Sequence, residues 1–128
     1  LWKINVQGWI SLLRESIPEL TLSAQGGRAG FAMTLSGVVA EAPTAGIAAY
    51  SAVKSALSAY SQAASRELRR SGIRLIDARP GHTETDLSKH PLAGVAPAFP
   101  AGLEPQVVAS RLVQAIENGE KDLPSSSF

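Results

Sequence analysis

Apolar residues at the start of the chain recur every three or four positions, which is the spacing of one face of a helix. This stripe runs from Trp2 to Leu20, and Pro18 lies close to where such a helix should stop. Residues 21–30 are rich in glycine and serine and predict a loop. We therefore predict a helix over residues 2–20.

Two short apolar runs, at residues 31–35 and 73–78, are bounded by turn residues as buried strands are. Between them, an alanine- and serine-rich segment at 48–71 has small residues spaced by three and four, and Gly72 stands where a helix would stop. This segment predicts a long helix that another helix or a sheet can approach closely.

The last third of the chain is predicted to be irregular until a final helix. Several prolines interrupt residues 86–104, which we interpret as a lid-like loop. Pro105 suits the first turn of a helix that Gly119 closes, and the serine-rich tail is expected to be frayed. Strands alternating with helices indicate an α/β fold with parallel strands joined by crossovers, within a single domain over residues 1–128.

Composition narrows the function classes. The chain has 45% hydrophobic and 18% charged residues, the balance of a soluble globular protein. A net charge of +1 argues against a nucleic-acid partner, and no apolar run approaches the ~18 residues of a membrane span. The absence of cysteine excludes disulfides and fits a reducing, cytoplasmic location. Because the chain starts at Leu1 and not at Met, we expect a processed or truncated product.

Candidate chemistry gathers at one predicted edge of the sheet. Open parallel sheets bind ligands beyond the carboxyl ends of their strands. Ser36 and Gly37 follow the first strand, and Pro80 to Thr85 follow the second. Tyr50 and Lys54 lie near the start of the intervening helix, one turn apart and so on one face.

A tyrosine beside a lysine has a clear chemical use. The phenol has an ordinary pKa of about 10, and a neighbouring ammonium favours the phenolate and lowers that pKa. Such a pair can exchange a proton with a substrate oxygen, and a nearby hydroxyl such as that of Ser36 can polarise a carbonyl. Hydride transfer would need a cofactor, because no side chain carries a hydride.

Several motifs together resemble the short-chain dehydrogenase/reductase family. Residues 48–54, Ala-Ala-Tyr-Ser-Ala-Val-Lys, resemble its Tyr-x-x-x-Lys segment, and residues 80–85 resemble its Pro-Gly-x-x-x-Thr loop. Residues 4–8, Ile-Asn-Val-Gln-Gly, resemble the family's Asn-Val-x-Gly helix start. The resemblance covers nearly all of the chain, from Leu1 to about Gly119, and implies the C-terminal, catalytic half of a Rossmann-like, doubly wound parallel sheet.

The resemblance also implies roles for individual residues. Tyr50 would be the general acid/base in an NAD- or NADP-dependent interconversion of an alcohol and a ketone or aldehyde. Lys54 would hold the nicotinamide ribose and lower the Tyr50 pKa, Ser36 would orient the substrate oxygen, and Asn5 would support a water beside Lys54. The cofactor-binding set would consist of Tyr50, Lys54, Pro80, Gly81, Thr83 and Thr85.

The chain departs from the family pattern in two places. In many relatives the serine lies thirteen residues before the tyrosine, and Gly37 holds that position here, whereas Ser36 lies fourteen before. A one-residue insertion in the following loop would restore Ser36 to the role. The chain also has no Gly-x-x-x-Gly-x-Gly turn, so the residues that would choose between NAD and NADP are missing and residues 1–128 alone are expected to be inactive.

Other readings of the sequence remain open. A non-catalytic α/β scaffold that keeps the fold only to dimerise is the alternative, and Gly37 is the residue that favours it. In either case the helices at 1–20 and 48–71 would be the contact surfaces of a homodimer or homotetramer. His82 and His90 have no partners at ligand spacing, so no metal site is expected. The substrate is expected to be a small carbonyl or alcohol, and the apolar residues of the 86–104 lid favour a partly hydrophobic one.

Overall fold

The computed structural model describes the whole chain, Leu1–Phe128. A π-helical segment η1 (Lys3–Gly8) leads into α1 (Trp9–Gln25), and β1 (Gly30–Leu35), α2 (Ala48–Leu68), β2 (Ile73–Ala78), α3 (Pro105–Glu117) and β3 (Asp122–Leu123) follow. Four short 3₁₀ turns, η2 (Val38–Ala40), η3 (Arg69–Ser71), η4 (Asp86–Lys89) and η5 (Ser125–Ser127), lie between or after these elements.

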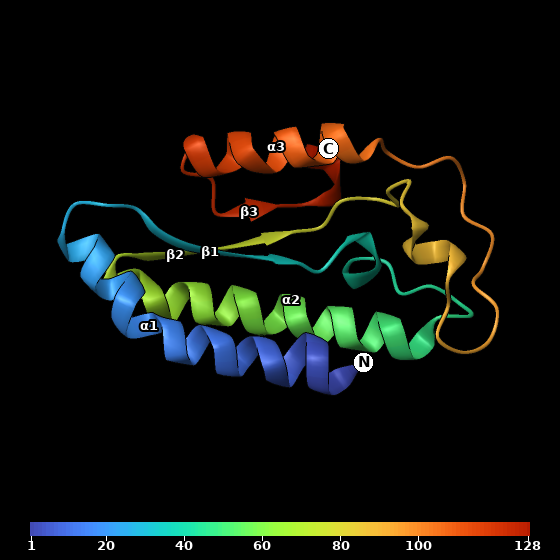
Figure 1. The fold of residues 1–128 in the computed structure, drawn as a ribbon, viewed down its shortest axis with the longest axis horizontal. Coiled ribbons are helices and arrows are strands. Elements are labelled where there is room, and N and C mark those ends of the chain that lie inside the picture. The colour runs from blue at the N-terminus through green and yellow to red at the C-terminus, as the bar shows by residue number, and fades with distance from the viewer.

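The strands form one parallel sheet in the order β1-β2-β3, with α1 and α2 on one face and α3 on the other (Figure 1). Strands β1 and β2 pair along their full lengths, from Gly30 with Ile73 to Leu35 with Ala78. Helices on both faces of a parallel sheet confirm the predicted doubly wound α/β class. Strand β1 lies at one edge of this sheet.

The two predicted strands and the long helix between them are confirmed within a few residues. Helix α2 begins at Ala48 and gives way to η3, after which Gly72 has a φ of 73°. That left-handed conformation favours glycine, because it costs a residue with a Cβ atom about 1 kcal/mol. Gly72 therefore lets the chain turn from the helix directly into β2.

The first helix was predicted to end at residue 20, just after Pro18, and this end is wrong. Helix α1 continues through that residue to Gln25. A proline inside a helix removes one backbone donor, but the helix can continue when the rest of its surface is well packed. The cluster of Leu13, Ala64 and Leu75, with Leu20 packed against it, holds the helix on the sheet on both sides of the proline.

The C-terminal tail is ordered and adds a strand that the sequence did not reveal. Asp122 and Leu123 pair with the end of β2, and Leu123 is fully buried. The Ser125 hydroxyl and backbone N–H both donate to Glu41, and Phe128 packs against the cluster under α3. The expected fraying of the tail is therefore wrong, since its polar groups have partners far away in the sequence.

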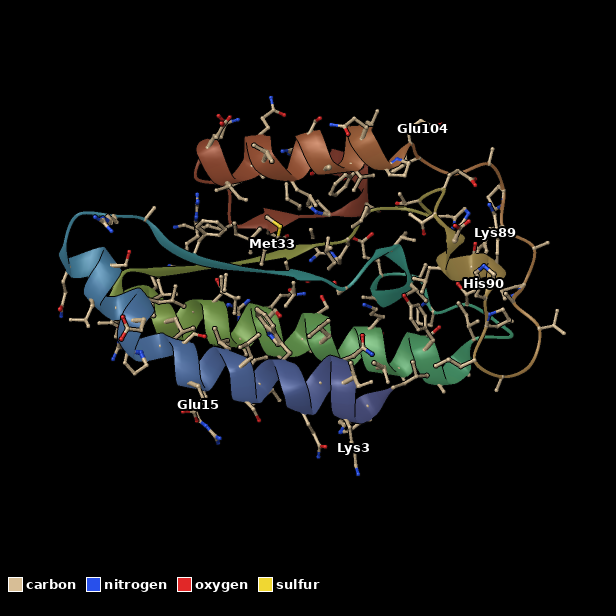
Figure 2. All side chains as sticks on the ribbon, in the orientation of Figure 1. Lys3, Glu15, Met33, Lys89, His90 and Glu104 are labelled. Carbon is tan, nitrogen blue, oxygen red and sulfur yellow. The ribbon has the colours of Figure 1, made fainter.

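Alternation along β2 assigns its side chains to the two faces of the sheet. Ile76 and Ala78 pack with Ala115 beneath α3, the side on which Met33 lies in Figure 2. Leu75 packs on the opposite side with α1 and α2. Because successive side chains of a strand point to opposite faces, Asp77 lies on the α2 side, where it is 3% exposed.

Candidate active site

The predicted edge of the sheet does bring the candidate segments together. The carboxyl ends of β1 and β2, the N-terminal end of α2 and the loop after Pro80 lie at one end of the molecule (Figure 1). The Val38 N–H donates to the Pro80 carbonyl at 2.8 Å, so the segments that follow the two strands are directly connected. The site therefore has a fixed backbone frame.

Tyr50 and Lys54 lie on the first two turns of α2 and are both partly buried. The Lys54 Nζ atom is 5.7 Å from the centre of the Tyr50 ring. The same Nζ atom donates a hydrogen bond of 2.8 Å to the carbonyl of Leu35, the last residue of β1. The ammonium is therefore held between the tyrosine and the end of the strand.

Burial sets the protonation of this pair. It raises the pKa of the Tyr50 phenol above its usual value, in contrast to the lowering that we expected from Lys54. Burial also lowers the pKa of Lys54, and the negative charge of Asp77 acts in the opposite direction. Without a bound ligand, the Tyr50 phenol is therefore protonated at neutral pH.

Asn5 lies in the π-helical segment η1, which packs against α2. Its Nδ2 donates to the carbonyl of Leu1 at 3.0 Å. A π-helical turn is rare and frequently marks a functional site. Asn5 is thus on the helix that lies beside α2, although its amide is bonded within its own helix.

Ser36, the predicted partner of Tyr50 at the substrate oxygen, lies directly after β1 with its hydroxyl bonded inside the protein. Its side chain is fully buried, and its hydroxyl donates to Asp77 Oδ1 at 2.7 Å. Gly37 follows with a φ of 80°, a conformation that favours glycine, so the position thirteen before the tyrosine carries no hydroxyl. The Ser36 hydroxyl is therefore engaged by Asp77.

Replacing Ser36 by alanine separates the two roles of this residue. We expect the free energy of unfolding to fall by about 1–3 kcal/mol, because a buried carboxylate loses a donor. We also expect kcat/KM to stay within about tenfold of the parent value, less than the loss of an oxyanion donor causes. Denaturant unfolding and steady-state kinetics of the complete protein measure the two effects.

The matched control is Ser16→Ala, which removes an exposed hydroxyl bonded to Leu12. It should change neither quantity. A loss of about a hundredfold or more in Ser36→Ala, with unchanged stability, would return Ser36 to the substrate oxygen.

The loop after β2 holds the base of the lid. Leu103 pairs with this loop through two backbone hydrogen bonds, from its N–H to His82 at 2.7 Å and from Glu84 to its carbonyl at 2.9 Å. The His82 ring also stacks on Phe99 with 4.7 Å between ring centres. The Thr85 hydroxyl accepts the Leu87 N–H at the start of η4. The four predicted cofactor residues Pro80, Gly81, Thr83 and Thr85 therefore lie on a loop that also anchors residues 86–104.

The model of one known family, described as short chain dehydrogenase, matches residues 1–94, which is most of the chain and includes every predicted site residue. The chain belongs to the short chain dehydrogenase family. None of the curated proteins compared with it gives a significant match.

Several solved structures share the fold of this chain. One is a short chain dehydrogenase from Burkholderia cenocepacia in complex with NADP, at 20% identity and a TM-score of 0.79, covering 96% of this chain and 47% of the other. A Sphingobium yanoikuyae enzyme with NADPH has 23% identity and a TM-score of 0.79, over 97% and 46%. A 3-ketoacyl-(acyl-carrier-protein) reductase from Brucella melitensis with NADH has 21% identity and a TM-score of 0.78, over 94% and 52%. The chain spans about half the length of these proteins.

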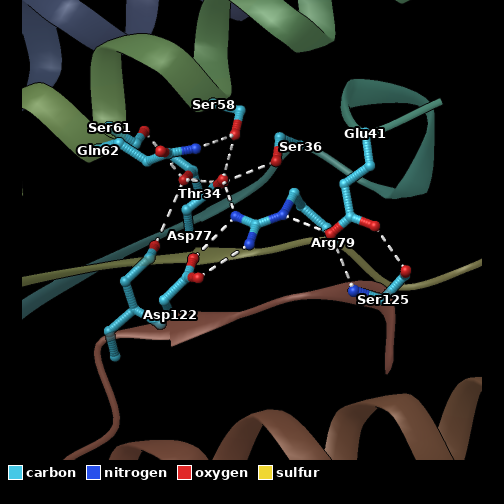
Figure 3. A network of polar contacts seen from close by, with 11 residues as sticks. Thr34, Ser36, Glu41, Ser58, Ser61, Gln62, Asp77, Arg79, Asp122 and Ser125 are labelled. Atoms are coloured by element: carbon cyan, nitrogen blue, oxygen red, sulfur yellow. Dashed lines mark hydrogen bonds and ion pairs between the residues drawn. The ribbon is translucent and has the colours of Figure 1, made fainter. Parts of the chain in front are cut away.

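A buried polar network beside the candidate site was not predicted from the sequence (Figure 3). Arg79 is 6% exposed and binds three carboxylates, those of Glu41 at 2.7 Å, Asp77 at 2.7 Å and Asp122 at 2.8 Å. Asp77 and Arg79 lie two residues apart, inside and just after a largely buried strand, which is the one signal that could have revealed the network.

Neither a metal site nor a membrane-spanning helix is found in the structure. It contains no group of three or more histidine, cysteine or carboxylate side chains that could hold a metal ion. No helix is long and apolar enough to cross a membrane.

Proposed function

We propose that the protein containing this chain is an NAD- or NADP-dependent oxidoreductase that interconverts an alcohol and a ketone or aldehyde, with Tyr50 as general acid/base. The observation that carries the proposal is the Tyr50–Lys54 pair, partly buried at the carboxyl edge of a parallel sheet. Family membership and the nicotinamide cofactors bound in similar structures support it.

The residues at this edge fit the nicotinamide end of such a cofactor. An ammonium has three N–H donors, and Lys54 uses one of them on the Leu35 carbonyl, so two remain for ribose hydroxyls. The Thr85 hydroxyl accepts one backbone hydrogen bond and can still donate. Pro80, Gly81 and Thr83 would form the backbone wall beside it.

When bound, the nicotinamide supplies or accepts the hydride that no side chain can carry. Tyr50 gives its phenolic proton to the oxygen of a carbonyl substrate during reduction and takes a proton from the alcohol during oxidation. Lys54 keeps a positive charge beside the phenolate that forms, and Asn5 lies on the neighbouring helix in a position to order water near Lys54. The lid at 86–104 excludes bulk water and provides apolar contacts for the substrate.

In this proposal, one side-chain hydroxyl binds the substrate oxygen. Because Gly37 occupies the serine position and Ser36 bonds to Asp77, Tyr50 is the hydroxyl that binds the substrate oxygen. The same observation favours the second candidate, a non-catalytic scaffold that dimerises through η1, α1 and α2. The two candidate functions differ in that the oxidoreductase turns over a substrate and the scaffold does not.

Cofactor binding and turnover by the complete protein test the proposal. We expect NADH or NADPH to bind, as measured by fluorescence titration. We also expect a panel of ketones and aldehydes to be reduced, as measured by the loss of the absorbance of reduced nicotinamide at about 340 nm. Lys54→Met should weaken cofactor binding by about tenfold or more, because a charged hydrogen-bond donor is lost.

Lys3→Met is the matched control, since Lys3 points away from the sheet in Figure 2 and should leave the affinity unchanged. Cofactor binding without turnover of any substrate would favour the scaffold. The absence of both would contradict the proposal.

A further inference from the structure

Asp77 is a buried carboxylate whose two oxygens each accept two hydrogen bonds. Its Oδ1 accepts the hydroxyls of Thr34 at 2.8 Å and Ser36 at 2.7 Å, and its Oδ2 accepts Ser58 at 2.6 Å and Arg79 at 2.7 Å. A buried charge of this kind is tolerated only when it is paired and hydrogen-bonded. The mechanism proposed above gives it no role.

On the strand side, Asp77 holds the end of β1 (Figure 3). Thr34 and Ser36 are the residues on either side of Leu35, and both donate to the same carboxylate oxygen. The Leu35 carbonyl between them is the one that accepts the Lys54 ammonium. Asp77 therefore fixes the backbone that carries the acceptor for Lys54.

On the helix side, Asp77 holds α2. Ser58 lies one turn after Lys54 and donates to Asp77 Oδ2. Ser61, on the next turn, lies 3.1 Å from the Thr34 hydroxyl. The helix that carries Lys54 is thus tied to the same carboxylate as the strand that receives its hydrogen bond.

We propose that Asp77 is the positioning residue of the Tyr50–Lys54 pair, because it binds both the strand and the helix that meet at the Lys54–Leu35 hydrogen bond. The inference rests on the proposed function, since it assigns how that site is held in place. Asp77 makes no hydrogen bond with Tyr50 or Lys54. It acts on these two side chains through the backbone that it holds and through its negative charge.

The charges around Lys54 favour the ammonium form. Asp77 lies on β2, and Arg79 beside it is shared with two further carboxylates, Glu41 after η2 and Asp122 on β3. One positive charge against three negative charges leaves the cluster negative. On its own helix, Lys54 faces the neutral phenol of Tyr50. Removing the Asp77 charge should therefore move Lys54 toward its neutral form.

Asp77→Asn in the complete protein tests this role, because it keeps the shape and removes the charge. The control is Asp122→Asn, which removes a carboxylate from the same arginine without a bond to β1 or α2. The first readout is the Lys54 pKa, measured without cofactor by NMR of ¹³C-methylated lysines and assigned with Lys54→Arg. The second is the pH profile of kcat/KM.

We expect Asp77→Asn to lower the Lys54 pKa relative to both the parent and Asp122→Asn. The high-pH limb of the profile should then shift to lower pH, and kcat/KM should fall by up to about a hundredfold, the cost of a misplaced catalytic group. A folded Asp77→Asn protein with an unchanged Lys54 pKa and pH profile overturns the proposal.

Ser58→Ala provides a second test if Asp77→Asn does not fold, because it detaches only the helix from the carboxylate. It should lower kcat/KM by a smaller factor than Asp77→Asn, and parental kinetics would overturn the proposal. If no carbonyl substrate is turned over, the proposed function fails. The Lys54 pKa still tests Asp77 in that case, since its measurement needs no turnover.

Discussion

Replacing Tyr50 by phenylalanine in the complete protein is expected to lower kcat by about 10²- to 10⁴-fold, the usual contribution of general acid/base catalysis. The ring and its partial burial are kept, so the fold should be retained. Steady-state kinetics with the best carbonyl substrate measure the loss. Tyr60→Phe is the matched control, because Tyr60 lies on the same helix and packs against the Leu13 cluster. Its activity should equal that of the parent.

The pH dependence follows from the raised pKa of Tyr50. Burial keeps the phenol protonated through neutral pH, so loss of the phenolic proton should lower the rate of reduction only at alkaline pH. Alcohol oxidation needs the phenolate and should rise with pH instead. Both dependences should disappear in Tyr50→Phe. Activity of that variant within a few-fold of the parent would remove Tyr50 from the mechanism.

Replacing Arg79 by methionine is expected to lower the free energy of unfolding by about 3–5 kcal/mol, because one partner of a buried ionic network is lost. The variant leaves Asp77 buried with one donor fewer, beside two more carboxylates. The hydrogen bond with Asp122 is the largest influence on Arg79 and raises its pKa, whereas burial lowers it. Urea denaturation of the complete protein measures the difference.

Arg111→Met is the control, since Arg111 binds Glu120 at 2.7 Å in a more exposed position, with side chains 21% and 31% exposed. Pairs of this kind typically contribute about 0–1 kcal/mol. Equal losses in the two variants would show that the Arg79 network is no stronger than an ordinary surface pair.

The pattern of apolar residues predicted the helices because each buries one face, and it predicted β2 because that strand is an apolar run buried on both faces. The run at 73–78 and the alanine-rich helix before it appear in the structure with nearly the predicted bounds. The two-residue strand β3 could not be predicted, since its order comes from pairing with β2 and from contacts of the tail with Glu41. Contacts between distant segments leave no local pattern.

The positions of the candidate site residues could be predicted from the topology of the sheet, but the directions of their side chains could not. Tyr50 and Lys54 were expected on one helix face near the strand ends, and the structure places them there. The direction of the Ser36 side chain was not predictable, because a residue at a strand end can face either side of the sheet. Asp77 decides the direction here by drawing the hydroxyl into the interior. The catalytic roles of these residues stay predictions.

The backbone pairs between Leu103 and the loop after β2 have a consequence for how such a site can diversify. They close the lid at its base, so the residues in between form a loop whose ends are fixed independently of its length. For a flexible loop, each doubling of length costs only about 0.6 kcal/mol of closure entropy. Insertions, deletions and sequence changes between η4 and Phe99 can therefore accumulate at little cost to folding. Changes of this kind leave the tyrosine, the lysine and the strand ends in their positions.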